Sequence, residues 1–378
     1  MNNFLARLTG GHLIFDGSMG ALIEARGIKT RCPAALNAEN SEAIRSIHAD
    51  YAAAGADVSI TNTFGANPIK LRALGMEERL NELIEKGVEN ARAAGNFVAL
   101  DIGPTGEFLR PVGTKSVEEM VDGFRACARA GKNADAVIIE TMADVAECRA
   151  ALVAAKETGL PVVASMTFEK NCRTLTGNTP ECCALILEHA GASAIGINCS
   201  GGPDEMIEPL RRMRAVTNLP IVVQPNAGLP VMCECGCVTY PFSPEDMAVS
   251  MQKLADAGAT SIGGCCGTTP AHISAMKSVV FPAFEKKELP GYICSQRQFV
   301  RIDEINAARV DDVDDLLDLD DDINAVEFVL DGLSEDEAIE AIEEAQTLCQ
   351  LPFLFEEGTS ERVLLHYTGV PGSFPMRA

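Results

Sequence analysis

Residues 134–158, ADAVIIETMADVAECRAALVAAKET, decide the fold because they contain one complete strand-and-helix unit. The run 134–140 is short, apolar and rich in Val and Ile, which is typical of a buried strand. From Val145 to Thr158 apolar residues recur at helical spacing, and Gly159 then closes the helix. Such a unit predicts a parallel α/β sheet, in which each helix returns the chain to the start of the next strand.

The same unit recurs along the chain up to about residue 280. Short apolar runs that resemble strands occur at residues 12–16, 56–61, 96–101, 134–140, 161–166, 192–198, 220–225 and 259–263. Helical patterns between these runs cover residues 41–54, 77–94, 116–131, 145–158, 180–190, 205–217 and 244–257. Eight such units in a row predict a TIM (β/α)8 barrel, of the α/β class. An open doubly wound sheet is the alternative, but the chain lacks its Gly-x-Gly-x-x-Gly phosphate turn.

Composition limits the class of protein further. The chain has 378 residues, 47% of them hydrophobic, so it can bury one large core with an appendage, or two cores. It begins without the pattern of a signal peptide, and no run approaches the ~18 apolar residues of a membrane span. We therefore expect a cytoplasmic protein whose 14 cysteines are thiols and metal ligands. A net charge of −23 argues against nucleic acid and anionic membranes as partners.

The negative charge is concentrated near the C-terminus. Residues 291–378 contain 21 acidic and 5 basic residues, a balance of −16, whereas residues 1–290 carry −7. The composition changes at 285–290, where a Lys-Lys-Glu run is closed by Pro290 and few contacts are expected to cross. We therefore predict two domains, residues 1–288 and residues 289–378.

Three cysteines follow two of the predicted strands. Cys199 comes after the sixth run, and Cys265 and Cys266 come after the eighth, among glycines that let the chain turn. Active sites of TIM barrels lie at the C-terminal ends of the strands, so these thiols are expected on one rim. Three converging thiolates predict zinc with an open fourth position. A closed structural zinc site, or thiols that share no ion, are the alternatives.

Several spaced motifs resemble one known family. The motifs are Asp16-Gly-x-Met-Gly20, Thr61-Asn-Thr-Phe64, Gly196-x-Asn-Cys199, Pro225-Asn-Ala-Gly228 and Gly263-Gly-Cys-Cys-Gly-Thr-Thr-Pro270. Their order and spacing resemble the homocysteine S-methyltransferase family, especially the homocysteine-binding module of cobalamin-dependent methionine synthases. The resemblance covers roughly residues 5 to 285.

The resemblance implies a metal site and a substrate site. Cys199, Cys265 and Cys266 are similar to the family's zinc ligands, and Asn226 is similar to a weak fourth ligand that some members use before substrate arrives. Asn226 could instead only shape the turn after Pro225.

The resemblance also implies how the amino acid part of the substrate is held. Asp16 and Glu140 are similar to the acids that receive its amino group; the alternatives are helix caps and salt-bridge partners. The substrate carboxylate would then be held by Thr61 and by the backbone of Ser18, Met19 and Gly20.

The implied activity is zinc-dependent transfer of a methyl group to the thiol of homocysteine, giving methionine. The chain holds no recognisable corrinoid-binding module, so the first choice of donor is methylcobalamin or another methylcorrinoid on a separate corrinoid protein. S-methylmethionine, S-adenosylmethionine and betaine are the alternative donors. A non-catalytic zinc-binding scaffold is the alternative of another class, and a demethylating enzyme is opposed by the intact cysteines.

The acidic C-terminal region predicts a βαβα appendage. Its expected elements are a strand at 323–330, a helix at 334–350 that starts with the capping box Ser334-Glu-Asp-Glu337, a strand at 351–355 and a short helix at 360–367. This order resembles a fragment of the pterin-binding barrel of methionine synthases, but a barrel needs roughly 250 residues, so we do not infer folate binding. Two open strands need covering, which predicts contact with the first domain, a corrinoid protein or a second copy of the chain in a homodimer.

Three further cysteines, Cys233, Cys235 and Cys237, alternate along the chain after Asn226. Alternate residues of an extended segment share a face, so these thiols could form a second metal or redox site. We favour no function for them, because the spacing is not that of a Cys-x-x-Cys pair.

Overall fold

A closed barrel of parallel strands forms the first part of the chain in the computed structural model, which describes residues 3–229, 231–232 and 238–375. Its hydrogen-bonded strands, in spatial order, are β1 (Val58–Ile60), β2 (Phe97–Ile102), β3 (Ala136–Met142), β4 (Val162–Met166), β5 (Ala194–Asn198), β6 (Ile221–Gln224) and β9 (Ser261–Ile262). Ile14 bridges Ile262 and Phe15 bridges Val58, both in parallel, so the segment around them joins the last strand to the first. The predicted TIM barrel is confirmed, with a strand or bridge at each expected run.

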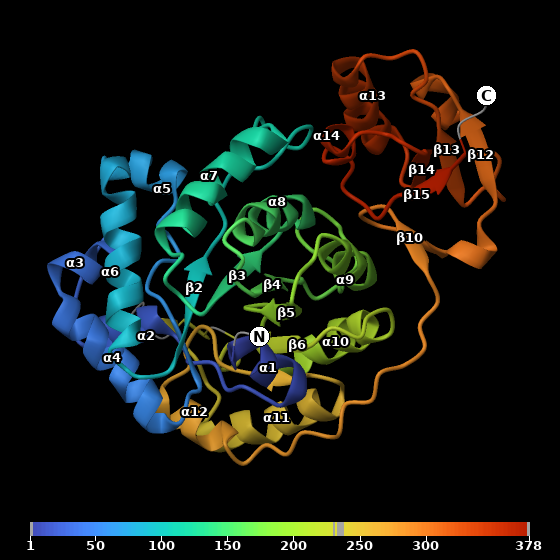
Figure 1. Cartoon of the computed structure of the whole chain (residues 1–378). Helices are drawn as coiled ribbons and strands as arrows, with labels where there is room; N and C mark the ends of the chain where they lie inside the picture. The colour runs from blue at the N-terminus through green and yellow to red at the C-terminus, as the bar shows by residue number, and fades with distance from the viewer. Residues whose placement is uncertain (1–2, 230, 233–237, 376–378) are drawn as a thin grey trace.

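A ring of helices surrounds the strands (Figure 1). The main helices are α4 (Ser41–Ala54), α6 (Leu80–Arg92), α7 (Val117–Ala130), α8 (Val145–Lys156), α9 (Pro180–His189), α10 (Ile207–Arg214), α11 (Pro244–Asp256) and α12 (Pro270–Met276). Shorter elements are α2 (Met19–Ala25), α3 (Leu36–Glu39), α5 (Pro68–Ala73), the 3-10 helices η1 (Pro33–Ala35), η2 (Glu77–Arg79) and η3 (Pro203–Met206), and the strand pair β7 (Val231–Met232) and β8 (Val238–Thr239). The helical spacing in the sequence thus predicted each main helix from α4 to α11 to within a few residues. No helix of the described segments is long and apolar enough to cross a membrane.

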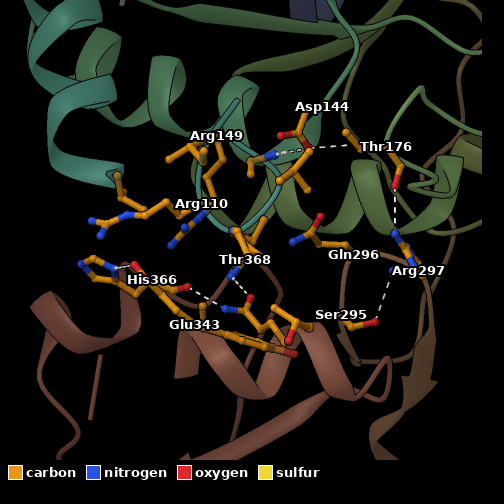
Figure 2. A pocket seen from close by; sticks show the side chains of 18 of the residues that line it. Arg110, Asp144, Arg149, Thr176, Ser295, Gln296, Arg297, Glu343, His366 and Thr368 are labelled. Atoms are coloured by element: carbon orange, nitrogen blue, oxygen red, sulfur yellow. Dashed lines mark hydrogen bonds and ion pairs between the residues drawn. The ribbon is translucent and has the colours of Figure 1, made fainter. Parts of the chain in front are cut away.

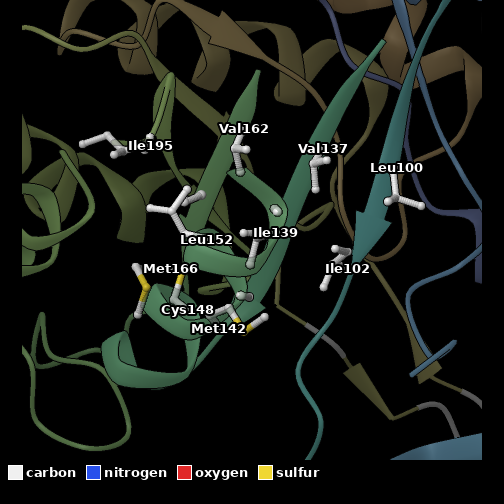
Figure 3. Close-up of a cluster of buried hydrophobic side chains, with 14 of the residues drawn as sticks. Leu100, Ile102, Val137, Ile139, Met142, Cys148, Leu152, Val162, Met166 and Ile195 are labelled. Atoms are coloured by element: carbon white, nitrogen blue, oxygen red, sulfur yellow. The ribbon is translucent and has the colours of Figure 1, made fainter. Parts of the chain in front are cut away.

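The barrel is packed with apolar side chains on both faces of its strands. Outward-facing residues of β2 to β5 pack against α8 (Figure 3). Inward-facing residues such as Ile138 and Val222 fill the centre, together with Phe4 and Leu8 of α1 (Asn3–Gly10). Each fully buried side chain of this size contributes about 1.5–3 kcal/mol. Because α1 occupies the N-terminal end of the barrel, the mouth lies at the C-terminal end.

The appendage is a four-stranded parallel sheet preceded by a hairpin. Its sheet has the order β12 (Ala307–Val310), β13 (Ala325–Phe328), β14 (Phe353–Glu356) and β15 (Gly372–Phe374); the hairpin is β10 (Tyr292–Cys294) with β11 (Phe299–Arg301). The helices are η4 (Ile302–Glu304), η5 (Val313–Leu317), α13 (Glu335–Leu348) and α14 (Glu361–Leu364). The predicted strands, helices and capping box are present. The sequence missed the hairpin and the short flanking strands β12 and β15, so the expectation of only two strands was wrong.

The appendage sheet is covered within this chain. Phe328, Phe353 and Ile342 pack on the face that α13 covers. Ile293, Leu354 and Phe374 pack on the other face, on the side of the hairpin. The outer edges of β13 and β14 pair with β12 and β15. The two predicted strands are therefore covered within this chain, and they need no outside partner to cover them.

The appendage also contacts the barrel. Cys294 of β10 packs into the main apolar core beside α9. Arg149 of α8 donates to the carbonyl oxygen of Leu365 at 2.8 Å, and His366 lies between Glu343 of α13 and Glu118 of α7. The connecting residues 279–291 form neither helix nor strand and run along the outside of the barrel (Figure 1). We propose that the boundary between the two domains lies between residues 288 and 289.

Candidate metal centre and substrate site

Three cysteine sulfur atoms meet at the C-terminal mouth of the barrel. Cys199 directly follows β5, and Cys265 and Cys266 follow β9. All three Sγ atoms lie within 4.8 Å of one another, and those of Cys199 and Cys266 are 3.9 Å apart. Two sulfur ligands about 2.3 Å from a tetrahedral zinc ion would be about 3.8 Å apart. The spacing therefore fits one zinc ion shared by three thiolates, and it leaves a fourth position for another ligand.

The backbone around these cysteines is held in unusual conformations. Cys199 has φ 58°, a left-handed conformation that is uncommon and strained for a residue with a side chain. A Cβ atom on Gly264 would lie 2.3 Å from Thr268 Oγ1, so only glycine lets the chain pass there. Gly267 has φ 76° and lies against the ring of Tyr240. The strained conformation of Cys199 and the close backbone approach that Gly264 and Gly267 permit turn the thiols toward one point.

Asn226, after β6, connects the two cysteine loops. Its amide oxygen accepts a hydrogen bond from the backbone N–H of Cys266 at 3.0 Å, and its amide nitrogen donates to the carbonyl oxygen of Cys199 at 3.2 Å. Both ends of the amide are thus occupied by backbone groups. A role of Asn226 as a fourth metal ligand stays a prediction; its contacts in this structure are those of a positioning residue.

The thiols influence one another's protonation. Hydrogen bonds from Cys199 and Cys265 lower the pKa of Cys266 to about 3, and Tyr240 adds a further hydrogen bond to the same sulfur. The same interactions with Cys199 and Cys266 raise the pKa of Cys265 well above the usual value. Like-charged groups this close share one negative charge between them unless a cation is present. A divalent cation would allow all three to ionise.

Three carboxyl groups lie at the same mouth. Asp16 follows the bridging residues Ile14 and Phe15 that close the barrel, Asp101 belongs to β2 and Glu140 belongs to β3. Burial, together with the charges of neighbouring acids, raises the pKa of Glu140 to about 8 and that of Asp101 well above the usual value. Burial also raises the pKa of Asp16, although the nearby His48 lowers it. The site therefore holds acids that are costly to ionise until a cation enters.

Two of these carboxyl groups have an oxygen atom without a hydrogen bond. In the described part of the chain, Oδ1 of Asp16 and Oδ1 of Asp101 are buried and unpaired. The other oxygen of Asp16 accepts from the backbone N–H of Ile60 at 3.0 Å and lies 3.9 Å from Nδ1 of His48. Lys70 lowers the pKa of Asp101, but less than burial raises it. Unpaired buried acceptors of this kind suit a ligand that brings N–H donors.

The predicted carboxylate site lies at the start of α2. Ser18 is the N-cap and its side chain accepts from the N–H of Ala21, so Met19 and Gly20 are in the first helical turn, where N–H groups have no partner within a helix. Thr61 is buried, and its hydroxyl already accepts from the N–H of Asp101 at 2.9 Å and meets the hydroxyl of Thr63 at 2.6 Å. The first-turn N–H groups of Met19 and Gly20 thus offer donors, whereas the N–H of Ser18 donates to Thr268 Oγ1 at 3.2 Å and Thr61 is engaged within the protein. The substrate-binding role of these residues stays a prediction.

Sequence reasoning missed several residues of the mouth. Asp101 ends the predicted run 96–101, in the position that Glu140 takes in its own run, so its placement was a usable signal. His48 and Tyr240 reach the site only through packing, and no pattern in the sequence marks them. Asn198 holds Thr141 at φ 60° through hydrogen bonds of 2.8 Å to its backbone N–H and hydroxyl.

The second cysteine group, Cys233, Cys235 and Cys237, lies outside the described residues. The prediction that these thiols have no function is therefore neither supported nor opposed by the fold.

Known proteins resemble this chain over the barrel. Methionine synthases of Mycobacterium tuberculosis and Mycobacterium leprae are 32% and 31% identical to it over 294 residues. The match covers 71% of this chain and only 24% of each of those proteins, so the chain spans about a quarter of their length. The metallated form of the homocysteine methyltransferase MmuM from Escherichia coli is a structural match with a TM-score of 0.62 and 29% identity. That match covers 71% of this chain and 96% of MmuM.

The family profile agrees with these matches. The profile described as homocysteine S-methyltransferase matches residues 13–280, which include the three cysteines and the three acids of the mouth. The resemblance drawn from the sequence motifs is confirmed, and the chain belongs to the homocysteine S-methyltransferase family.

Proposed function

We propose that this chain transfers a methyl group to the thiol of homocysteine, giving methionine. The observation that carries the proposal is that three cysteine sulfurs within 4.8 Å of one another share a barrel mouth with buried, unpaired carboxyl oxygens. A thiol that also bears an amino group would bind the cysteine-held metal through its sulfur and donate N–H groups to these oxygens. The reaction forms one S–C bond, breaks the donor's bond to the methyl carbon and releases the thiol proton.

The cysteines supply the metal end of the proposed site. Cys199, Cys265 and Cys266 would hold Zn²⁺, which when bound supplies a Lewis-acidic position that keeps a thiol ionised near neutral pH. Asn226 fixes the distance between the two cysteine loops through its backbone hydrogen bonds. The left-handed conformation of Cys199 keeps its sulfur directed at the other two.

The acids supply the amino-acid end. An ammonium group beside Asp16, Asp101 and Glu140 would lower their pKa values, because an opposite charge at close range favours the ionised carboxyl. The free oxygens of Asp16 and Asp101 would accept its N–H donors. The first-turn N–H groups of Met19 and Gly20 would receive the substrate carboxylate, which also suits the positive end of the helix dipole.

We propose a methylcorrinoid, carried by a separate protein, as the methyl donor. The support is the similarity to methionine synthases, about a quarter of whose length this chain matches. S-methylmethionine, S-adenosylmethionine and betaine are the alternative donors. A cytoplasmic location is part of the same proposal, as is a second copy of the chain as the alternative partner of the appendage.

The test is a donor assay with the zinc-loaded full chain. Homocysteine is incubated with each donor in turn, and methionine is measured by mass spectrometry. We expect methionine from protein-bound methylcorrinoid and less from free methylcobalamin. Methionine from S-methylmethionine alone would contradict the donor, and none from any donor would favour a zinc-binding scaffold.

Proton release separates the enzyme from the scaffold without turnover. Adding homocysteine to zinc-loaded protein should release about one proton per site, since the thiol must ionise to bind the metal. No release at saturating homocysteine would show that the thiol does not reach the cysteines.

A further inference from the structure

A cavity of about 280 Å³ lies between the barrel and the appendage. Its barrel side consists of residues from the loops that follow β2, β3 and β4 and from α8; its other side comes from the hairpin, α13 and the segment after α14 (Figure 2). None of the cysteines or acids of the barrel mouth lines it. This cavity, which we call the seam pocket, is therefore separate from the proposed methyl-transfer site.

Arg149, which is half-buried on α8, lines the barrel side of the seam pocket. Its guanidinium donates to the carbonyl oxygens of Leu365 at 2.8 Å and Leu364 at 3.4 Å, and no carboxylate pairs with it in the described chain. Burial lowers the pKa of Arg149 to about 10, so the group remains charged at neutral pH. A guanidinium has five N–H donors, so several are left for another acceptor.

Two more arginines line the seam pocket without carboxylate partners. Arg297, in the turn of the hairpin, donates to the carbonyl oxygen of Thr176 at 3.1 Å. Arg110, in the loop after β2, has no side-chain hydrogen bond or ion pair among the described residues. Figure 2 shows these arginines entering from different elements around one space. Arg110 and Arg297 are exposed and Arg149 is half-buried, so three guanidinium groups without an ion pair line one cavity in a chain of net charge −23.

The acids of the seam pocket are already engaged. Asp144 caps α8 through the N–H of Ala146 at 3.2 Å and accepts from the hydroxyl of Thr176 at 3.1 Å. Glu343 meets Nδ1 of His366 at 2.8 Å. Neither acid therefore neutralises an arginine.

We propose that the seam pocket binds a small molecule through an oxyanion group, a phosphate or a carboxylate. Planar guanidinium groups match the paired oxygens of both anions, and charge-assisted hydrogen bonds of this kind are about twice as strong as neutral ones. Apolar lining residues such as Leu109, Val153 and Leu351 give room for a small apolar part of the ligand. Because both parts of the chain form the pocket, the ligand stabilises the docked appendage.

The first experiment measures binding to the full chain by titration calorimetry, with inorganic phosphate and with succinate as separate probes. We expect one of them to bind with a stoichiometry of one and to raise the thermal unfolding temperature. Binding of phosphate alone identifies a phosphate-bearing ligand, and binding of succinate alone identifies a carboxylate. Absence of binding by both at millimolar concentration overturns the proposal.

The second experiment locates the site with variants. Arg110→Gln and Arg297→Gln each should weaken binding about ten-fold or more, since each removes a charge-assisted contact. The matched control is Arg129→Gln, which removes the same charge from an exposed site on α7 outside the seam pocket. Equal weakening by the control would show diffuse attraction and overturn the proposal. The readout is binding alone, so it is independent of whether the chain transfers methyl groups.

Discussion

The barrel mouth and the seam pocket carry opposite unpaired charges, although neighbouring strand-to-helix loops build both. At the mouth, Asp16 and Asp101 have buried oxygens that nothing in the described chain satisfies. At the seam, Arg149 and Arg297 contact carbonyl oxygens and no acid. At the mouth, a buried carboxyl oxygen without a partner costs free energy, so its persistence indicates a ligand that brings donors. At the seam, the half-buried Arg149 and the exposed Arg297 keep donors available for an anion.

The two regions differ in how they tolerate the missing partner. A carboxyl can become neutral, and the raised pKa of Glu140, about 8, expresses that response to burial and to the neighbouring Asp16. A guanidinium cannot lose its proton near neutral pH, so Arg149 keeps its charge and uses carbonyl oxygens instead. The mouth should therefore be sensitive to pH, and the seam pocket to anions.

The largest expected effect is loss of the metal from the mouth. Cys199→Ala, Cys265→Ala and Cys266→Ala each should abolish zinc retention and activity but leave the barrel folded, because the metal would lie on the rim and not in the core. Zinc content by atomic emission checks the loss of the metal, and the circular dichroism spectrum checks that the barrel stays folded. Cys172→Ser, outside the cluster, is the control and should retain zinc. Stoichiometric zinc in all three variants would refute the ligand assignment.

The next effect concerns the acids of the mouth. Glu140→Gln and Asp101→Asn should raise the half-saturating concentration of homocysteine, since a lost charge-assisted contact costs about 1.5–3 kcal/mol. A thiol without the amino group should be affected far less, which the ratio of KM values measures. An equal change for both thiols would mean that these acids only support the fold. Replacing Glu107, an acid outside the mouth, by Gln should change neither value.

A pH dependence of stability follows from the same acid. The pKa of Glu140 is about 8 in the folded protein against an ordinary 4.5. Burying this carboxyl therefore leaves the folding stability unchanged below pH 4.5, where the group is neutral in both states, and lowers it fully above pH 8. Metal-free Glu140→Gln should therefore match the wild type near pH 5 and exceed it at pH 8 by about 1–2 kcal/mol, after allowing for partial exposure. Urea unfolding at both pH values measures this difference. The same difference in stability between variant and wild type at both pH values would contradict this prediction.

The smallest effect lies at the edge of the seam. His366 meets Glu118 of the barrel at 2.9 Å and Glu343 of the appendage at 2.8 Å, and only a protonated imidazole donates to both. His366→Gln should lower stability by about 1 kcal/mol. A double-mutant cycle with Glu118→Gln separates this contact from general damage, because coupling survives only if the two residues interact. A coupling energy near zero would show that the pair does not link the two parts.

Sequence reasoning succeeded where the chemistry is local or periodic. The spacing of apolar residues in 134–158 placed β3 and α8, and the same pattern placed the other barrel units. The cysteine trio was found because strand ends of a barrel meet on one rim, so 199 and 265 come together despite their separation. The flanking strands β12 and β15 were missed because Ala307–Val310 contains a charged residue and Gly372–Phe374 contains one large apolar residue, so neither is a continuous apolar run.

The sequence by itself determined the barrel, the three thiols and the acidic character of the C-terminal region, since hydrophobic period and residue type are written locally. Only the tertiary structure decided that His48 joins the mouth, that Asn226 ties the cysteine loops together, and that arginines from three separate segments surround one cavity. These features depend on which loops pack together and on how deeply a charge is buried. No single stretch of chain encodes either quantity, because burial and electrostatic partners are properties of the whole packed molecule.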